Sequence, residues 1–404
     1  MNLREIRQLI QMEPVELDTV KRRLSHCHSI GDLRRSSRRL IPRPVFDYVD
    51  GAADEETSLA ANTAAFRRYR FRPRELVDVS KVDTSTQILG RPASLPLGLA
   101  PTGYSRMMHP DGEAAVARAA ARRNLPYTLS TMGTTSIEDV AAAAHAVGHH
   151  EIWYQLYVIQ NMAQTRDMVE RAAASGYQVL TVTVDTTFLG FRTRDERNGL
   201  VIPPQLTAKT IASIGSRPAY WVRMLRNPAI TFANFPPAPP GEPVNFHVGK
   251  FRADITWDYL AELRASWPGQ LLVKGPLGAA DARRAVEAGA DGIQLSNHGG
   301  RQLDQSVAPI DLVAEVREAV GPGPAVLIDS GIRHGMDLAI AVALGADAGL
   351  IGRAYLYGLM AGGEPGVDRA LEILATQFQR TMQLLGVTSV AELRKEGPNL
   401  LIRS

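Results

Sequence analysis

From residue 95 onward, short apolar segments alternate with longer segments whose apolar positions recur every three or four residues. Continuous apolar runs are typical of strands buried on both faces, and a 3.6-residue period is typical of a helix with one buried face. The apolar runs predict eight strands, at residues 95–100, 127–130, 152–157, 179–184, 271–273, 293–295, 325–328 and 349–351. The periodic segments predict helices at residues 112–123, 137–144, 163–174, 256–267, 279–288, 310–320, 336–344 and 367–385.

Strands that alternate with helices through short loops predict an α/β fold with parallel strands and right-handed crossovers. Eight such units favour a closed (β/α)8 TIM barrel over an open doubly wound sheet. The open sheet is the alternative, but it calls for a glycine fingerprint after its first strand, which Pro101-Thr-Gly-Tyr-Ser-Arg lacks. We expect a helical lead-in at 1–90, the barrel at 91–388 and a C-terminal tail at 389–404.

The connection after the fourth predicted strand, at about 197–256, is far longer than the others. A loop of this length over one end of a barrel is usually a lid, an interaction surface or disordered. Its aromatic residues Tyr220 and Trp221 lie near Arg217 and Arg223, a combination that also suits a membrane interface. A lid or a contact between subunits is the first interpretation, and a peripheral membrane contact is the second.

The composition is that of a soluble globular protein, with 45% hydrophobic and 22% charged residues. The net charge of +3, without concentrated basic patches, gives no reason to expect a nucleic-acid partner. The single cysteine, Cys27, suits a reducing compartment, and its neighbours His26 and His28 lack the usual spacing of metal ligands. No apolar run approaches the ~20 residues that span a bilayer. We therefore expect a cytoplasmic protein without a metal site.

Polar side chains concentrate where the predicted strands end. In a barrel all strands end at one mouth, so residues distant in sequence meet there. The first five strand ends supply Pro101, Thr102, Gly103, Ser130, Gln155, Tyr157, Thr183, Asp185 and Lys274. The last three supply Ser296, His298, Arg301, Asp329, Gly331, Arg333, Gly352 and Arg353. We expect these side chains to form one site.

The last two strand ends indicate a phosphate site. Gly331 and Gly352 stand where barrels commonly bind phosphate through backbone N–H groups. Arg333 and Arg353 add forked donors that suit phosphate oxygens. The alternative is a pair of arginines in ordinary helix-capping turns. The paired glycines favour a ligand that carries a phosphate.

The segment Ser296-Asn-His-Gly-Gly-Arg-Gln-Leu-Asp304 places an imidazole and a guanidinium three residues apart. His298 suits a base, and Arg301 suits an anionic substrate. By itself the segment is equally compatible with a structural histidine and a surface arginine. Lys274 suits either a Schiff base, as in barrel aldolases, or the stabilisation of negative charge on a cofactor ring.

Together these segments resemble the FMN-dependent α-hydroxy-acid dehydrogenase/oxidase family. The resemblance extends from about Pro44 to Thr388. It rests on Ser296–Asp304, Gln155-Leu-Tyr157, Thr183-Val-Asp185, Val273-Lys-Gly275, Ile328-Asp-Ser-Gly-Ile-Arg333 and Ile351-Gly-Arg353. It implies an FMN cofactor and oxidation of an L-2-hydroxy acid to the 2-keto acid.

The resemblance also implies individual roles. His298 would be the base, and Asp185 would stabilise its imidazolium form. The substrate would be held by Tyr48, Tyr157, Arg192 and Arg301. Lys274 would lie beside the flavin and favour its anionic reduced form. The cofactor would be bound by Pro101, Thr102, Ser130, Gln155, Thr183, Ser296, Asp329, Arg333, Gly352 and Arg353, with Gly103 and Gly331 beside them.

Only a few positions indicate which members of this family the chain resembles most. Met132 stands where glycolate oxidase has tryptophan, whereas Gly103 and the long loop resemble the respiratory L-lactate dehydrogenases. We therefore expect L-lactate as substrate, a quinone or another carrier as electron acceptor, a homotetramer, and peripheral contact with the inner face of the cell membrane. An oxidase that uses O2 is the second hypothesis. A flavin-binding barrel recruited as an assembly or sensor protein, and a lysine-dependent aldolase, are weaker alternatives.

Overall fold

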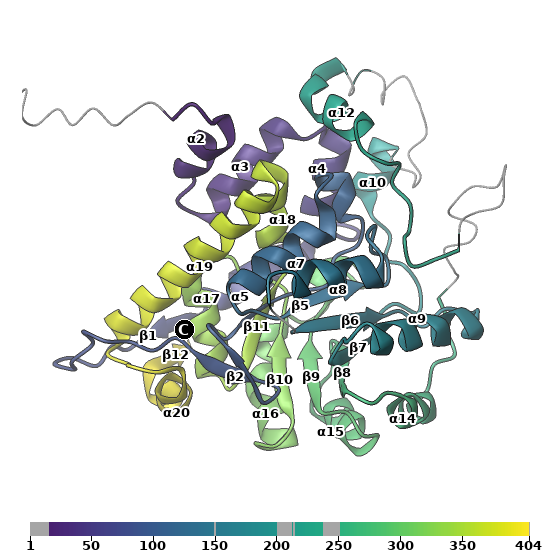
Figure 1. Cartoon of the computed structure of the whole chain (residues 1–404). Helices are drawn as coiled ribbons and strands as arrows, with labels where there is room; N and C mark the ends of the chain where they lie inside the picture. The colour runs from purple at the N-terminus through teal and green to yellow at the C-terminus, as the bar shows by residue number, and fades with distance from the viewer. Residues whose placement is uncertain (1–15, 149–150, 200–211, 213–214, 237–250, 404) are drawn as a thin grey trace, which may run out of the picture.

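The computed structural model describes residues 16–148, 151–199, 212, 215–236 and 251–403. At its centre, parallel strands close into a barrel in the order β10-β11-β4-β5-β6-β7-β8-β9 (Figure 1). The strands are β4 (Leu97–Leu99), β5 (Tyr127–Ser130), β6 (Ile152–Leu156), β7 (Val179–Thr183), β8 (Gln270–Gly275), β9 (Gly292–Leu295), β10 (Ala325–Ile328) and β11 (Ala348–Ile351). Each predicted strand is present, and the predicted (β/α)8 barrel is confirmed.

The barrel interior is a packed core closed at its lower end by a hairpin. Strands β5, β6 and β7 are buried at every residue, as their unbroken apolar runs require. Trp153 of β6 packs with Val179 and Leu272 of the next strands. Ile88 and Ala93, from the hairpin of β2 (Thr86–Ile88) and β3 (Arg91–Ala93), join the same cluster. Only the opposite end, where the strands finish, remains available for a site.

Helices surround the barrel. They are α7 (Gly112–Arg122), α8 (Ile137–His145), α9 (Met162–Ala174), α14 (Trp257–Ser266), α15 (Ala279–Glu287), α16 (Val313–Val320), α17 (Gly335–Ala343), α18 (Arg353–Gly362) and α19 (Glu364–Leu385). The sequence pattern predicted all of these except α18. Every residue of α18 is buried, so this helix has no polar face and no 3.6-residue alternation to reveal it.

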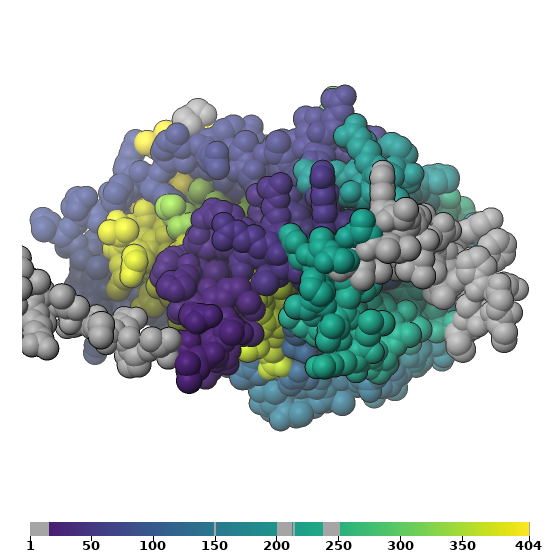
Figure 2. All heavy atoms as spheres, turned by 90° about the horizontal axis from the view of Figure 1, so that it is seen from above, coloured from purple at the N-terminus to yellow at the C-terminus, as the bar shows by residue number. Residues whose placement is uncertain are grey.

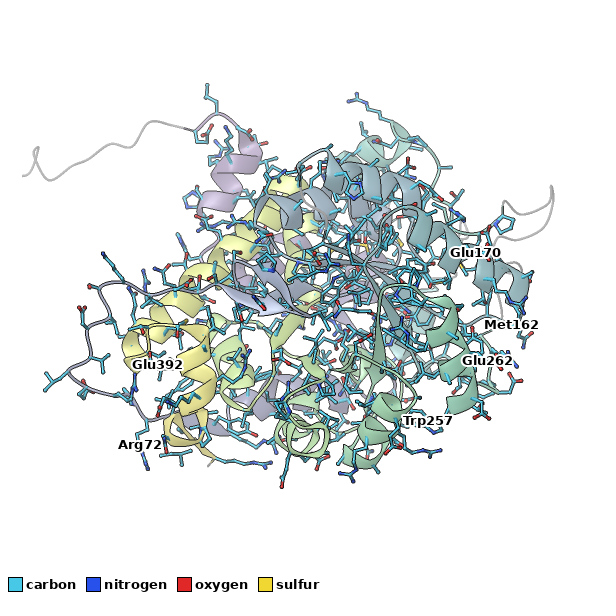
Figure 3. The ribbon with its side chains drawn as sticks, turned by 60° about the horizontal axis from the view of Figure 1, so that its bottom comes forward. Arg72, Met162, Glu170, Trp257, Glu262 and Glu392 are labelled. Carbon is cyan, nitrogen blue, oxygen red and sulfur yellow. The ribbon has the colours of Figure 1, made fainter. Side chains whose placement is uncertain are left out.

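The lead-in and the C-terminal segment pair with each other on one flank. The lead-in forms α2 (Thr19–Ser25), α3 (Ile30–Leu40), α4 (Arg43–Asp50) and α5 (Thr57–Phe66), followed by β1 (Tyr69–Phe71). The C-terminal segment forms α20 (Val390–Leu400) and β12 (Leu401–Arg403), which pairs antiparallel with β1. Figure 3 shows Arg72 and Glu392 together on this flank, with Met162 and Glu170 of α9 and Trp257 and Glu262 of α14 on the opposite one.

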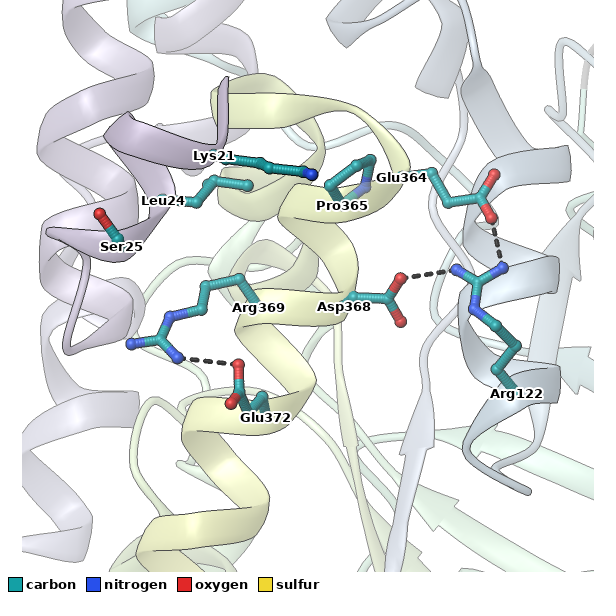
Figure 4. Close-up of a pocket in the computed structure, with 9 residues that line it drawn as sticks. All are labelled: Lys21, Leu24, Ser25, Arg122, Glu364, Pro365, Asp368, Arg369 and Glu372. Atoms are coloured by element: carbon teal, nitrogen blue, oxygen red, sulfur yellow. Dashed lines mark hydrogen bonds and ion pairs between the residues drawn. The ribbon is translucent and has the colours of Figure 1, made fainter. Parts of the chain in front are cut away.

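Helix α2 rests on the C-terminal helices. Arg23 donates from Nε to the carbonyl of Ala361 at 2.7 Å. A hollow of about 700 Å³ remains between α2, α7 and α19 (Figure 4). Across it, Arg122 of α7 bonds Asp368 of α19 at 2.6 Å and also pairs with Glu364. This hollow shares no lining residue with the cavity at the barrel mouth.

Above the strand ends, the segment after β7 lies beside the lead-in helices. It forms α10 (Thr193–Asn198) and α12 (Pro218–Leu225), and Tyr220 of α12 donates to the carbonyl of Met107 at 2.7 Å. Figure 2 looks down on this end and shows the purple lead-in and the teal insertion covering it. The remaining parts of the predicted long loop, 200–211, 213–214 and 237–250, lie outside the described residues. Among the helices of the described residues, none is long and apolar enough to cross a membrane.

Candidate active site

A cavity of about 1150 Å³ opens at the carboxyl ends of the barrel strands. Most of the residues predicted for the site line it. They are Tyr48, Pro101, Thr102, Gly103, Ser130, Tyr157, Arg192, Lys274, Ser296, His298, Arg301, Asp329, Gly331, Arg333, Gly352 and Arg353. Gln155, Thr183 and Asp185 do not line the cavity, but each is buried directly behind it and bonded to a lining or neighbouring residue. The predicted convergence of strand ends therefore holds.

His298 lies between a phenol and a carboxylate. Its Nε2 is 3.1 Å from the hydroxyl of Tyr157, and its Nδ1 is 3.3 Å from Oδ1 of Asp185. The backbone carbonyl of Asp185 accepts a hydrogen bond from Gln302 at 2.8 Å. The second carboxylate oxygen of Asp185 is buried and has no hydrogen-bond partner among the described residues. The carboxylate thus orients the ring and leaves Nε2 on the side of the Tyr157 hydroxyl.

The surroundings of His298 favour its neutral form, mainly through burial. Burial lowers the pKa of His298, Lys274 lowers it further, and Asp185 offsets part of the effect. Burial raises the pKa of Asp185, but the electrostatic effects of His298 and Lys274 and the hydrogen bond to His298 outweigh burial, so that its pKa falls below the usual value. Burial also raises the pKa of Tyr157, which therefore remains a phenol. A neutral imidazole beside an ionised carboxylate is the state that a general base requires.

A left-handed turn brings His298 and Arg301 to the same cavity. Residues 298 to 300 have φ values of 58°, 66° and 76°, and two of the three are glycines, which adopt this conformation readily. The amide of Asn297 supports the turn, because its oxygen accepts from the N–H of Gly300 at 3.1 Å. Asn297 and Asn62 of α5 bond each other through both amides, at 2.7 and 2.8 Å. Sequence reasoning missed Asn62, since nothing local to α5 marks it.

Two half-buried arginines, Arg192 and Arg301, line the cavity. Arg301 donates to the carbonyls of Tyr48 at 2.6 Å and Gly51 at 3.1 Å, and it lies 4.8 Å from the centre of the Tyr48 ring. The Nε of Arg192 is buried and has no hydrogen-bond partner among the described residues. No carboxylate of the described residues forms a salt bridge with either group. Burial and the neighbouring Arg192 lower the pKa of Arg301 to about 9. Neighbouring cations that lack a salt bridge favour an anionic ligand, such as a carboxylate.

The end of β11 meets the requirements of a phosphate site. Helix α18 begins at Arg353, and its N-cap, Gly352, supplies no side-chain cap, so the first N–H groups of the helix remain available. Arg353 is fixed by donation to the carbonyls of Val49 at 2.8 Å and Gly299 at 2.9 Å, and burial lowers its pKa to about 10. Gly331 has φ of 113°, and a Cβ there would lie 2.4 Å from the carbonyl of Asn62. These residues fit the phosphate of FMN.

A row of buried polar side chains crosses the barrel beside this site. Ser130 donates to Oε1 of Gln155 at 3.0 Å, and Gln155 donates to Thr183 at 2.9 Å. Lys274 stands opposite Thr183 in the register of β7 and β8. Because β5 to β8 are neighbours, these groups form one edge, which suits the donors and acceptors of a flat heterocycle. The residues present therefore fit the isoalloxazine ring of FMN as well as its phosphate.

A site that fits FMN and also places Arg192 and Arg301 beside an oriented base is that of a flavin-dependent oxidoreductase for anionic substrates. Residues 37–399 match the family model described as FMN-dependent dehydrogenase. The chain belongs to this family, so its cofactor is FMN and its reaction is the oxidation of an L-2-hydroxy acid.

Relatives support the same assignment along nearly the whole chain. A protein of Mycobacterium tuberculosis provisionally named L-lactate dehydrogenase is 45% identical over 97% of this chain and 94% of its own length. The (S)-mandelate dehydrogenase of Pseudomonas putida is 38% identical over 90% of this chain and 92% of its own. A crystal structure of the monotopic membrane protein (S)-mandelate dehydrogenase superposes with a TM-score of 0.88 at 37% identity, covering 94% of this chain and all of that one.

Proposed function

We propose that the protein oxidises L-lactate to the 2-keto acid and passes the electrons to a quinone. The observation that carries the proposal is the placement of His298 Nε2, with Tyr157 3.1 Å away, in a cavity that also holds the unpaired Arg192 and Arg301. A base, a hydroxyl-binding phenol and a carboxylate clamp are what a 2-hydroxy acid requires. The 45% identity to a protein provisionally named L-lactate dehydrogenase supports L-lactate among such acids.

Each polar group has a defined task in this proposal. Arg301 and Arg192 bind the substrate carboxylate, and the ring and hydroxyl of Tyr48 complete that side of the cavity. Tyr157 binds the substrate hydroxyl and directs it towards His298. His298 takes up a proton at Nε2, and the ionised Asp185 at Nδ1 stabilises the imidazolium that results. The clamp holds the substrate in a fixed orientation, which lowers the entropic part of the barrier.

Bound FMN supplies the two-electron acceptance that no side chain of the protein can provide. Lys274 places a positive charge at the end of β8, where it stabilises negative charge that develops on the ring. Ser130, Gln155 and Thr183 hold one edge, while Ser296 and Asp329 bond each other at 2.7 Å on the neighbouring strands. Pro101, Thr102 and Gly103 line the wall of the cavity, and Gly331, Arg333, Gly352 and Arg353 hold the phosphate.

The alternative acceptor is O2, with hydrogen peroxide as the product. It is supported by 40% identity over 87% of this chain to the L-lactate oxidase of a Nostoc strain. Hydrogen peroxide measured during turnover, with and without a quinone, separates the two acceptors. A stoichiometric yield of peroxide that quinone does not suppress would favour the oxidase.

We further propose that the protein forms a homotetramer and contacts the membrane peripherally through the insertion. Val222 and Leu225 of α12 are exposed beside Arg223, a combination that suits the surface of an anionic bilayer. The solved (S)-mandelate dehydrogenase is described as a monotopic membrane protein. Flotation with anionic vesicles and sedimentation of the purified protein test these two points separately.

The substrate is tested most directly by mixing the oxidised holoenzyme anaerobically with L-lactate, glycolate or L-mandelate. Loss of the flavin absorbance near 450 nm reports reduction by each acid in a single turnover. We expect L-lactate to give the highest ratio of reduction rate to dissociation constant. If L-mandelate alone reduced the flavin, the lactate assignment would be wrong, although the family chemistry would stand.

A further inference from the structure

Three large apolar side chains stand at the rim of the active-site cavity and point into solvent. Phe188, Leu189 and Phe191 all belong to the lining of the cavity, and their exposed fractions are 78%, 64% and 58%. We call this group the apolar rim. It follows Asp185 and directly precedes Arg192, so it lies on the same loop as two residues of the site. Large apolar residues exposed together usually mark a binding surface.

The backbone that carries the apolar rim is fixed on both sides. Gln302, itself buried, donates to the carbonyls of Asp185 and Phe188 at 2.8 Å and accepts from the N–H of Gly190 at 3.2 Å. On the other side, the carbonyl of Phe191 accepts from the N–H of Asp54 at 2.8 Å. These hydrogen bonds therefore hold the backbone in the conformation that leaves the three side chains exposed.

Close packing at Gly190 reinforces this anchoring. A Cβ at Gly190 would lie 2.5 Å from the carbonyls of both Arg301 and Gln302, so only glycine lets the loop approach the β9 turn this closely. Gly190 packs against the turn, while its neighbours Leu189 and Phe191 remain largely exposed. The same contact holds the apolar rim beside the carboxylate clamp.

The interior and the rim of the cavity differ in chemistry. The interior carries the cations Lys274, Arg192 and Arg301, which suit the hydroxy-acid anion. The rim offers aromatic and aliphatic surface, which favours an uncharged, flat and apolar molecule. After the keto acid leaves, the electrons remain in this cavity until a second substrate collects them. The rim borders the opening through which such a molecule approaches.

We propose that the apolar rim binds the ring of a quinone, the second substrate of the reaction. This assignment rests on the proposed function and adds to it the residues that select the acceptor. Oxidation of the hydroxy acid to the keto acid releases two electrons and two protons, and reduction of the quinone to the hydroquinone consumes both. Phe188 and Phe191 stack on or against the quinone ring, and Leu189 covers its edge.

The test separates acceptor binding from substrate oxidation. The purified holoenzyme is reduced anaerobically by titration with dithionite and then mixed with decylubiquinone or with ferricyanide, while recovery of the flavin absorbance is followed. Ferricyanide is a hydrophilic anion that gains nothing from apolar contact. The variants are Leu189→Ser and the double substitution Phe188→Ser with Phe191→Ser. The matched control is Leu384→Ser, an exposed leucine of α19 that does not line the cavity.

We expect the second-order rate constant for decylubiquinone to fall about tenfold or more in the rim variants, because each loses apolar contact area with the ring. The constant for ferricyanide should change by less than about twofold, and Leu384→Ser should match the unaltered protein with both acceptors. Because dithionite replaces the hydroxy acid, failure of L-lactate to reduce the flavin would overturn the substrate assignment and leave this experiment valid.

Several results would overturn the proposal. Reoxidation of the unaltered reduced protein by ferricyanide and not by decylubiquinone would do so, and so would an equal loss of reaction with both acceptors in the rim variants. If the rim variants kept the quinone kinetics of the unaltered protein but sedimented with a lower mass, the apolar rim would be a contact between subunits. If the rim variants kept these kinetics but no longer bound anionic vesicles, the apolar rim would be a lipid contact.

Discussion

The hydroxyl of Tyr357 in α18 donates to Oδ1 of Asp50 at 2.8 Å and so joins the helix after β11 to the end of α4. Asp50 also accepts from Arg34 at 2.8 Å and from Arg194 at 3.2 Å. The residues on either side of Asp50 carry carbonyls that hold the active-site guanidiniums. Val49 accepts from Arg353, and Gly51 accepts from both Arg301 and Arg353. This buried carboxylate therefore positions both arginines through the backbone.

Replacing this carboxylate tests that role. We expect Asp50→Asn to lower the free energy of unfolding by about 2 kcal/mol, because it weakens hydrogen bonds to two arginines while leaving their charges in place. The value is modest because the side chain of Arg34 is half exposed. Urea unfolding followed by circular dichroism measures it. Asp254→Asn, at an exposed pair with Arg252, is the control and should change stability by less than about 0.5 kcal/mol.

Acid should remove the contribution that the Asp50 carboxylate makes to the free energy of unfolding. Burial raises the pKa of Asp50, but its hydrogen bonds to Arg34 and Tyr357 dominate and hold the pKa at about 2. A carboxyl whose pKa is lower in the folded state stabilises the protein above its unfolded value of 3.8 and loses that stabilisation as the pH falls towards 2. The stability difference between the unaltered protein and Asp50→Asn should therefore shrink between pH 4 and pH 2. A constant difference over that interval would show that Asp50 acts through packing alone.

Loss of the base should stop substrate oxidation and leave the cofactor bound. We expect His298→Gln to lower the rate of flavin reduction by L-lactate at least 10³-fold, within the range for removal of a general base. FMN content should stay stoichiometric, since none of the groups assigned to the phosphate is altered. His26→Gln, at an exposed position outside the cavity, is the control. Substantial turnover of His298→Gln would remove His298 from its assigned role.

Local sequence patterns were enough to predict the barrel. The strands are buried on both faces, so each appears as an unbroken apolar run, and the polar residues that follow were correctly expected to meet. Helix α18 escaped detection for the opposite reason, because a fully buried helix has no alternation. The partners that fix the site also lack a local signal: Asn62 meets Asn297, and Arg353 meets Val49, only after folding. Contacts of this kind depend on the tertiary arrangement and leave no periodic trace.

The dependence of flavin reduction on pH should report the neighbours of His298. Because burial and Lys274 place its pKa below the usual 6.5, the base is more than half unprotonated at pH 6.5, and the midpoint of the acidic limb should lie below that pH. Asp185 raises the pKa of His298, so Asp185→Asn should move this acidic limb to still lower pH. The same substitution should lower the maximal rate about 100-fold, because the imidazolium loses its counter-ion. Stopped-flow reduction between pH 4.5 and pH 8 measures both effects, and a limb that moved to higher pH would contradict the assigned contact.

The carboxylate clamp should act mainly on substrate binding. Arg301 presents a planar fork held by the carbonyls of Tyr48 and Gly51, and a lysine cannot reproduce its paired hydrogen bonds. We expect Arg301→Lys to raise the dissociation constant for L-lactate by about 10- to 100-fold, equivalent to the loss of about 1.4 to 2.7 kcal/mol from a charge-assisted pair. The reduction rate at saturating lactate should fall less than in His298→Gln, because the base is retained. Arg252→Lys, outside the cavity, is the matched control. Unchanged lactate affinity in Arg301→Lys would show that Arg192 alone binds the carboxylate and that Arg301 serves to hold the segment from Tyr48 to Gly51 in place.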